Sequence, residues 1–364
     1  MLYRETGQFK TTYAADQQLF PIRQDRIAMA ILLAVAFVGV PLVSVVPAAA
    51  AAIDLNYWFN GMLIPFLIFS LAALGLNILT GYAGQLSLGT AAFMAVGAFA
   101  AYNFELRVPG IPMLASFILA GVVAALVGIV FGLPSLRIKG FYLAVATLAA
   151  QFFLDWMFIR IQWWTNYSPS GSANAPRLIL FGWHADRPFE KYLLALSFAV
   201  LFALIAKNLV RGRFGRSWMA IRDMDIAAEI IGIRPMNAKL SAFAVSSFVC
   251  GVAGALWAFV YLQSWEPLAF DINRSFQLLF MVIIGGLGSI LGSFLGAAFI
   301  VMLPIFLNQV PAALGVPLAT DTVSHLEFMT FGALIIFFLI VEPRGLARLW
   351  AIGKEKLRLW PFPH

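Results

Sequence analysis

The sequence predicts an all-α, polytopic integral membrane protein with about ten transmembrane helices. Of its 364 residues, 62% are hydrophobic and only 11% are charged, which is more apolar surface than a soluble core of ordinary composition can hide. Each spanning helix needs roughly 20 mostly apolar residues. The apolar runs that meet or approach this length lie near residues 28–52, 57–79, 85–103, 111–133, 140–161, 189–209, 238–263, 276–288, 290–307 and 327–341.

Basic residues fall unevenly on the two sides of these spans. Only six of the 24 Lys and Arg residues lie in the predicted outer segments: Arg107, Arg160, Arg177, Arg187, Lys191 and Arg274. Because short cytoplasmic loops carry an excess of Lys and Arg, both termini are expected in the cytoplasm, with the chain in a bacterial inner membrane. This orientation also explains the pI of about 9.7, so no nucleic-acid partner is expected.

Three regions are expected along the chain: a cytoplasmic segment at 1–27, a transmembrane domain at 28–341 and a basic cytoplasmic tail at 342–364. The first apolar run ends in Val-Pro-Ala-Ala-Ala-Ala-Ala, so a cleaved signal peptide is one alternative. Its apolar stretch of about 25 residues exceeds the 7–15 of a signal sequence, which favours an uncleaved anchor. Cys250 is the only cysteine, which excludes an intramolecular disulfide and a cysteine-cluster metal site.

Two glycine-rich tracts interrupt pairs of apolar runs, one in each half of the chain. They span residues 81–89 and 285–292. Paired interruptions of this kind indicate a translocation pathway, because irregular backbone survives in a membrane only beside protein or a water-filled cavity. The alternative is that the small residues simply allow close helix packing. The candidate pathway residues are Gly84, Gln85, Ser87, Gly89, Thr90, Gly285, Gly286, Gly288 and Ser289.

The longest predicted cytoplasmic segment contains an amphipathic pattern. Between residues 213 and 233 the apolar residues recur at spacings of three and four, which predicts one helix with an apolar face. These residues are Phe214, Trp218, Ile221, Met224, Ala228 and Ile231. Gly232 and Pro235 supply the stop. Such a helix could lie on lipid headgroups, or its apolar ridge could dock on a soluble partner; the flat Ala-Ala pair at 227–228 favours docking.

Five motifs, in order along residues 57–346, resemble the branched-chain amino acid permease family of ABC importers, and its M-type subunit most. They are Gly75-Leu76-Asn77, Gly81-Tyr82-Ala83-Gly84-Gln85-Leu86-Ser87-Leu88-Gly89, Gly215-Arg216-Ser217-Trp218-Met219-Ala220-Ile221-Arg222-Asp223 with Ala227-Ala228-Glu229 and Gly232, Gly285-Gly286-Leu287-Gly288-Ser289, and Glu342-Pro343-Arg344-Gly345-Leu346. The chain departs from the family at Thr90, where His is common, and in the outer loop 165–174.

The resemblance implies a division of labour among several subunits. It predicts a second homologous permease, two cytoplasmic ATP-binding subunits and a periplasmic solute-binding protein, with the chain itself embedded in membrane lipid. The residues that it assigns to coupling with the ATPase are Trp218, Ile221, Arg222, Asp223, Ala227, Ala228, Glu229 and Gly232. The chain contains no Gly-x-x-x-x-Gly-Lys-Ser/Thr motif, so ATP is expected to bind to the partners.

The expected function is therefore the translocation step of an ATP-driven importer of a small zwitterion, with branched-chain amino acids as the expected solute. Urea or short amides are an alternative, and a secondary transporter is a further one. Ion-driven transporters place charges at mid-membrane, whereas Asp155, Arg160 and Glu342 lie near the ends of predicted spans. No enzyme activity, cofactor or metal is expected, because the three histidines, His184, His325 and His364, are isolated in sequence.

Overall fold

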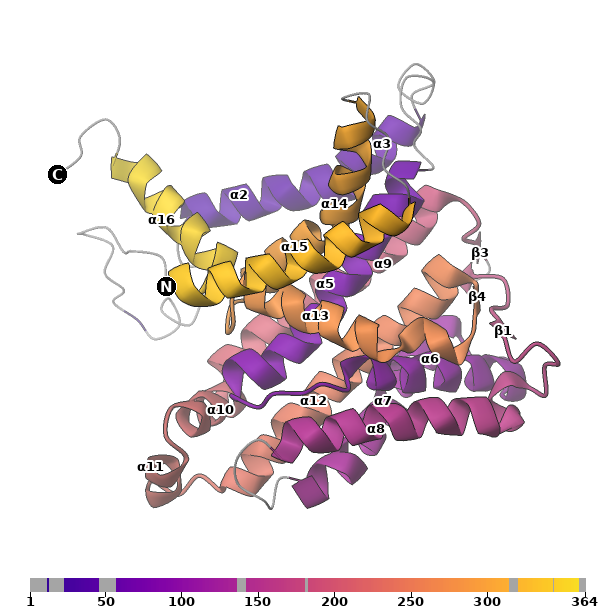
Figure 1. Ribbon diagram of the computed structural model, residues 1–364, viewed down its shortest axis with the longest axis horizontal. Helices are drawn as coiled ribbons and strands as arrows, with labels where there is room; N and C mark the ends of the chain where they lie inside the picture. Colours follow the sequence, from indigo (N-terminus) through magenta and orange to yellow (C-terminus); the bar gives the residue numbers. More distant parts are fainter. Residues whose placement is uncertain are drawn as a thin grey trace.

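The computed structural model is a bundle of long helices with short strands at one end (Figure 1). It describes residues 12, 23–45, 57–135, 142–180, 183–313, 320–342 and 344–359. The predicted segment 1–27 and the candidate signal-cleavage site lie mostly outside these residues, as do the last five residues, including His364. The all-α, polytopic fold predicted from the sequence is confirmed.

The helices follow the apolar runs closely. Their bounds are α2 (Arg23–Ala34), η1 (Val35–Gly39), α3 (Val40–Val45), η2 (Tyr57–Leu63), α5 (Ile64–Asn77), η3 (Ile78–Tyr82), α6 (Thr90–Arg107), α7 (Met113–Ser135), α8 (Tyr142–Arg160), η4 (Gln162–Thr165), α9 (Pro188–Arg211), α10 (Arg213–Asp223), α11 (Asp225–Ile230), α12 (Pro235–Leu256), η5 (Trp257–Leu262), η6 (Pro267–Phe270), α13 (Ile272–Gly285), α14 (Ile290–Ala313), α15 (Thr320–Val341) and α16 (Gly345–Leu359).

Among the described residues, eight helices are long and apolar enough to cross a membrane: Asp25–Val43, Tyr57–Tyr82, Met113–Pro134, Tyr142–Arg160, Pro188–Arg211, Pro235–Leu262, Pro267–Gly285 and Ile290–Gln309. The other two predicted spans, 85–103 and 327–341, correspond to α6 and α15. In α6 the apolar run ends in Glu105 and Arg107, and in α15 the strongly apolar part is the shorter Met329–Phe338. Every predicted span therefore contains a helix.

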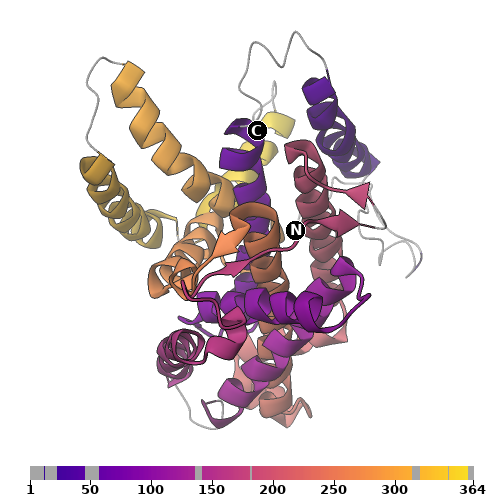
Figure 2. The same cartoon turned by 90° about the vertical axis from the view of Figure 1, so that its right-hand side faces the viewer.

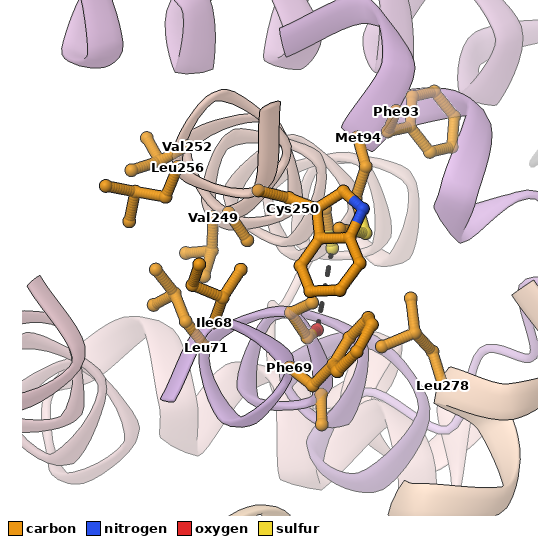
Figure 3. Packing of buried hydrophobic residues seen from close by; sticks show 14 of the residues in the cluster. Ile68, Phe69, Leu71, Phe93, Met94, Val249, Cys250, Val252, Leu256 and Leu278 are labelled. Carbon is orange, nitrogen blue, oxygen red and sulfur yellow. Dashed lines mark hydrogen bonds between the residues drawn. The ribbon is translucent and has the colours of Figure 1, made fainter. Parts of the chain in front are cut away.

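The centre of the bundle is formed by α5, α6 and α12, with α7 packed against α6 and α12. The spans Tyr57–Tyr82 and Pro235–Leu262 are each 83% buried inside the protein, whereas Asp25–Val43 is 0% buried and lies at the periphery. Figure 3 shows the α5–α12 contact, where the Cys250 thiol lies 3.7 Å from the carbonyl oxygen of Ala72. The single cysteine is thus a packing residue of the core.

Glycines bring α6 and α12 into backbone contact. A Cβ atom on Gly97 would collide with the carbonyl oxygen of Gly251, and one on Gly254 would collide with the carbonyl oxygen of Met94. Backbone atoms cannot move aside as a flexible side chain can. Small residues at these positions are therefore what allows the two central helices to cross, as is common in membrane proteins.

The two ends of the bundle differ. Figure 2 looks onto the end that carries four two-residue strands, β1 (Ala173–Asn174), β2 (Ile179–Leu180), β3 (Trp183–His184) and β4 (Ser264–Trp265). Antiparallel pairing of β1 with β4 joins the loop after α8 to the loop after α12. The opposite end carries α10, α11 and α16 (Figure 1).

An ion pair joins the first and last helices of the described chain. Lys354 Nζ of α16 lies 2.8 Å from Asp25 Oδ1 of α2. The beginning of α2 and the end of α16 therefore lie on the same side of the bundle, the side of α10 and α11 (Figure 1). This placement agrees with a chain that crosses the membrane an even number of times.

Candidate functional site

The two glycine tracts, far apart in sequence, meet where the span Tyr57–Tyr82 ends. A Cβ atom on Gly81 would collide with the backbone nitrogen of Gly288 and with the side-chain oxygen of Asn77. Gly288 itself has φ +74, a conformation that glycine adopts without strain. The close approach of these tracts therefore depends on glycine at both positions.

Asn77 joins the tracts by hydrogen bonds. Its Oδ1 accepts from the Gly288 amide at 2.9 Å, and its Nδ2 donates to the Ser289 carbonyl at 2.8 Å and to Ser293 Oγ at 2.9 Å. The side chain is completely buried. Because buried polar groups are costly unless paired, Asn77 fixes the turn between α13 and α14 against the end of α5.

The first tract then leaves the helix and runs as irregular backbone from Ala83 to Gly89 before α6 begins. It is closely packed. The Leu88 amide donates to Thr147 Oγ1 at 3.0 Å, and a Cβ atom on Gly89 would collide with the carbonyl oxygen of Thr147. The result is a broken span whose helical part starts inside the protein.

Side chains from other helices cap the buried start of α6. The Ala91 amide donates to Ser275 Oγ at 2.8 Å, and the Ala92 amide donates to Gln151 Oε1 at 2.9 Å. Gln151 Nε2 donates in turn to the Phe270 carbonyl at 2.8 Å and to both carboxylate oxygens of Asp155 at 3.1 Å. The first amides of a helix have no partner within it, so α8 and α13 supply what α6 lacks.

Three of the predicted pathway side chains lie along this broken span and are buried. Ser87 and Thr90 are each 2% exposed and Gln85 is 7% exposed. Neither polar atom of the Gln85 amide, nor the Thr90 hydroxyl, has a hydrogen-bond partner among the described residues. Gly84 is exposed and has φ +68, and a Cβ atom there would lie 2.8 Å from Cγ of Arg222.

The predicted pathway residues of the second tract make packing contacts. A Cβ atom on Gly285 would collide with the carbonyl oxygen of Gly292, and one on Gly286 would lie 2.5 Å from the carbonyl oxygen of Arg344. Ser289 precedes α14, and its Oγ accepts from the Gly292 amide at 3.1 Å, as an N-cap residue does. These contacts correspond to the packing alternative left open by the sequence.

The single helix predicted at 213–233 is wrong, because two short helices, α10 and α11, occupy this segment. Met224 separates them with an extended backbone, φ −162 and ψ 100. Asp225 lies in the first turn of α11, where a negative charge is favourable, and its carboxylate lies 3.7 Å from Lys239 Nζ of α12. The break changes which side chains face the bundle.

The predicted coupling residues consequently divide into two sets. Trp218, Ile221 and Ala228 are 1%, 6% and 2% exposed, and Trp218 Nε1 donates to Ser241 Oγ of α12 at 2.9 Å. Ala227, Glu229 and Gly232 are exposed. The side chains that present an apolar surface outward are Met224, Ile226, Ile230 and Ile231, exposed by 65%, 65%, 81% and 73%; we call them the α11 apolar surface.

The remaining two coupling residues, Arg222 and Asp223, form an ion pair, with Arg222 Nη2 2.8 Å from Asp223 Oδ1. Arg222 also reaches inward, because its Nη1 donates to the Gly81 carbonyl at 2.9 Å. α10 contacts α9, α12 and η3. It is therefore held firmly against the bundle, whereas α11 projects from it (Figure 1).

A sequence profile of the family described as branched-chain amino acid transport system / permease component matches residues 59–341. The chain belongs to this permease family. It is 29% identical over 309 residues to the high-affinity branched-chain amino acid transport system permease protein LivM of Salmonella typhimurium and to that of Escherichia coli K12, covering 77% of this chain and 68% of each relative.

The permease is also similar, over a shorter stretch, to a permease of a different import system. The permease is 30% identical over 125 residues to the autoinducer 2 import system permease protein LsrC of Klebsiella pneumoniae, covering 32% of this chain and 36% of that one. No solved structure matches the permease. Membership of the family identifies a multi-pass transport subunit, and the described residues contain no cluster of His, Cys, Asp and Glu that could hold a metal ion.

Three polar residues organise the permease interior: Asn77, Gln151 and Ser275. The sequence marked Asn77 only as part of a family motif, without a structural role, and it did not mark Gln151 or Ser275. Asn77 and Gln151 each interrupt an apolar run, whereas Ser275 follows Arg274 just before one. An uncharged polar residue inside a span is a usable signal, because it needs a partner in the membrane. Their partners come from helices distant in sequence. The signal could therefore have marked the residues without revealing what they bind.

Proposed function

We propose that this permease is the translocation subunit of an ATP-driven ABC importer in a bacterial inner membrane, with its termini and α10–α11 on the cytoplasmic side. It would work with a second homologous permease, two ATP-binding subunits and a periplasmic solute-binding protein. Family membership supports the role in transport. The observation that carries the ATP-driven mechanism is the α11 apolar surface, which lies outside the spans and has no described element covering it.

The occupant of this surface would be an ATP-binding subunit. Monomeric proteins rarely expose contiguous apolar patches without a partner, and an amphipathic helix that fits a groove is a common mode of recognition. A membrane surface is the other candidate occupant. The helix α11 projects away from the bundle (Figure 1), and Asp225 and Glu229 flank the α11 apolar surface; both features disfavour contact with anionic lipid.

The solute pathway would follow the broken span at 84–90. Two of its polar groups, the Gln85 amide and the Thr90 hydroxyl, have no partner among the described residues and could pair with the ends of a small zwitterion when the helices move apart. They carry no charge, so they would not retain a solute that has to be released. In this proposal Gly285, Gly286, Gly288 and Ser289 shape the pathway by fixing the neighbouring turn.

Branched-chain amino acids are the proposed solute, because the relatives that cover most of the chain are named for their transport. Urea or short amides remain the alternative solute. A solute-binding protein would select between them before the permease is reached. A secondary transporter is the alternative mechanism, and it would need neither ATP nor the α11 apolar surface.

Uptake by the complete complex tests this function. The permease, purified together with ATP-binding, second permease and solute-binding subunits from the same cells, would be reconstituted in vesicles and supplied with labelled leucine. We expect uptake that requires both ATP and the solute-binding protein. Uptake of labelled urea but not leucine would replace the proposed solute, and uptake driven by an ion gradient without ATP would refute the mechanism.

A further inference from the structure

The contact between Arg222 and Gly81 places the coupling segment against the junction of the two glycine tracts. The span Tyr57–Tyr82 ends in a π-helical turn, η3, after which the chain becomes irregular. The last carbonyl groups of a helix have no partner within it, and positive charge is favourable at this end. Arg222, which comes from α10 in another part of the chain, supplies both the hydrogen bond and the charge.

The same guanidinium lies beside the second tract. A Cβ atom on Gly288 would be 3.4 Å from Arg222 Nη1 and 3.3 Å from the Gly81 carbonyl oxygen. The Gly288 amide is held by Asn77, one turn before Gly81. A displacement of α10 would therefore act at one point on both the end of the Tyr57–Tyr82 span and the α13–α14 turn.

We propose that Arg222 and Asn77 form an inner clasp that transmits movement of α10 to both glycine tracts. Arg222 is then a positioning residue that holds the end of the Tyr57–Tyr82 span, and it is not a contact for the ATP-binding subunit. Asn77 holds the α13–α14 turn to the same span. This inference rests on the proposed function, because it assigns a path to the movement that an ATP-binding subunit would cause.

Three features of the structure support transmission over simple packing. The Arg222 hydrogen bond is charge-assisted, and such bonds are roughly twice as strong as neutral ones. Asn77 uses both of its amide hydrogens and its oxygen across the junction, so the two tracts move with it. Trp218 donates a hydrogen bond to Ser241 of α12, so α10 is attached to the bundle at a second point besides the contact of Arg222 with Gly81.

The test compares Arg222→Gln with Arg216→Gln in the complete complex. Both changes remove one positive charge from α10, but Arg216 is exposed and its side chain has no partner among the described residues. We expect leucine taken up per ATP hydrolysed to fall roughly tenfold in Arg222→Gln, the size of effect that loss of a charged hydrogen bond produces. Arg216→Gln should transport like the unmodified complex.

Asn77→Asp and Ser293→Ala test the other half of the clasp. Asn77→Asp keeps an acceptor for Gly288 and loses both donated bonds, whereas Ser293→Ala removes only one of the two acceptors. The ratio of uptake to hydrolysis should fall in the first and stay within about twofold in the second. Equal effects of the two changes would contradict the role of Asn77.

Hydrogen exchange gives a measurement that does not depend on the solute. In the unmodified complex, ATP should change amide exchange in residues 81–89 and 285–292, and Arg222→Gln should abolish this change in both tracts. Retention of the ATP-linked change in Arg222→Gln would overturn the clasp. Absence of any such change in the unmodified complex would instead count against the proposed function. Loss of assembly in both Arg222→Gln and Arg222→Lys would show that the contact serves folding, and would also overturn the clasp.

Discussion

Replacing Ile230 with aspartate should detach the ATP-binding subunit while leaving the permease folded. Ile230 is 81% exposed and Ala228, two residues earlier, is 2% exposed. A charge at position 230 therefore meets solvent in the free permease, whereas a charge at position 228 would be forced between α11 and the bundle. Comparing Ile230→Asp with Ala228→Asp therefore distinguishes loss of docking from loss of packing on a single short helix.

The size of the effect follows from the apolar area that docking would cover. Full burial of an isoleucine side chain contributes about 2 kcal/mol, so its loss alone weakens binding by roughly 30-fold. Desolvation of the new carboxylate adds to this value. We therefore expect the dissociation constant for Ile230→Asp to rise by about 30-fold or more.

The assay would measure binding of the isolated ATP-binding subunit to the permease held in lipid nanodiscs. Gly353→Asp on α16 is the matched control, since this position is exposed and a Cβ atom there meets nothing within 4 Å. Affinity of Ile230→Asp within threefold of the unmodified permease would refute the assignment of the α11 apolar surface. Loss of permease from the membrane would do the same, because it would place Ile230 in the folded core.

Three further predictions concern orientation and packing. Ser170→Cys and Ala227→Cys, both at exposed positions, should label from opposite faces of the membrane with an impermeant thiol reagent; labelling of both from the outside would contradict the orientation. Gly97→Leu should lower the amount of folded permease severalfold, measured by fluorescence-detected size exclusion, because its Cβ collides with backbone of α12; normal abundance would show that the α6–α12 crossing is looser than described. Gln151→Leu leaves the buried Ala92 amide without its partner and removes a hydrogen bond to the half-buried Asp155 carboxylate, at a cost of about 1–3 kcal/mol for the buried amide, so the melting temperature should fall; an unchanged melting temperature would argue against the capping network.

The positions of the spans could be predicted from the sequence because length and apolarity are strong signals in a membrane protein. The segments predicted at 276–288 and 290–307 became the helices α13 and α14, although both were shorter than an ideal span. The equivalent placement of the two glycine tracts, each at a turn between helices, was also predictable. Their direct contact through Asn77 was not, because 211 residues separate Asn77 from Gly288.

The coupling segment shows where periodicity is insufficient. Spacings of three and four extend through Met224, so the pattern predicts one continuous helix. The structure breaks the helix at this residue, and Trp218 and Ala228 are then both buried while Met224 faces outward. Tertiary contacts decided between helical and extended backbone, and those contacts are not visible in a local pattern.

The cap of α6 illustrates the same limit. The residue before the helix, Gly89, has no side chain to serve as an N-cap, and the sequence gives no sign of a substitute. The partners, Ser275 and Gln151, come from α13 and α8. Only the general rule that buried amides need partners could have predicted that such residues exist.

Site-specific cross-linking from α11 tests the central claim most directly. A benzophenone attached to Ile226→Cys, 65% exposed, would be activated in membranes that contain the complete complex; the native Cys250 is 1% exposed and should not react. We predict a single cross-linked product between the permease and the ATP-binding subunit, formed from Ile226→Cys and not from Ser170→Cys. Cross-linking of Ile226→Cys to lipid alone, or to the solute-binding protein, would contradict the account.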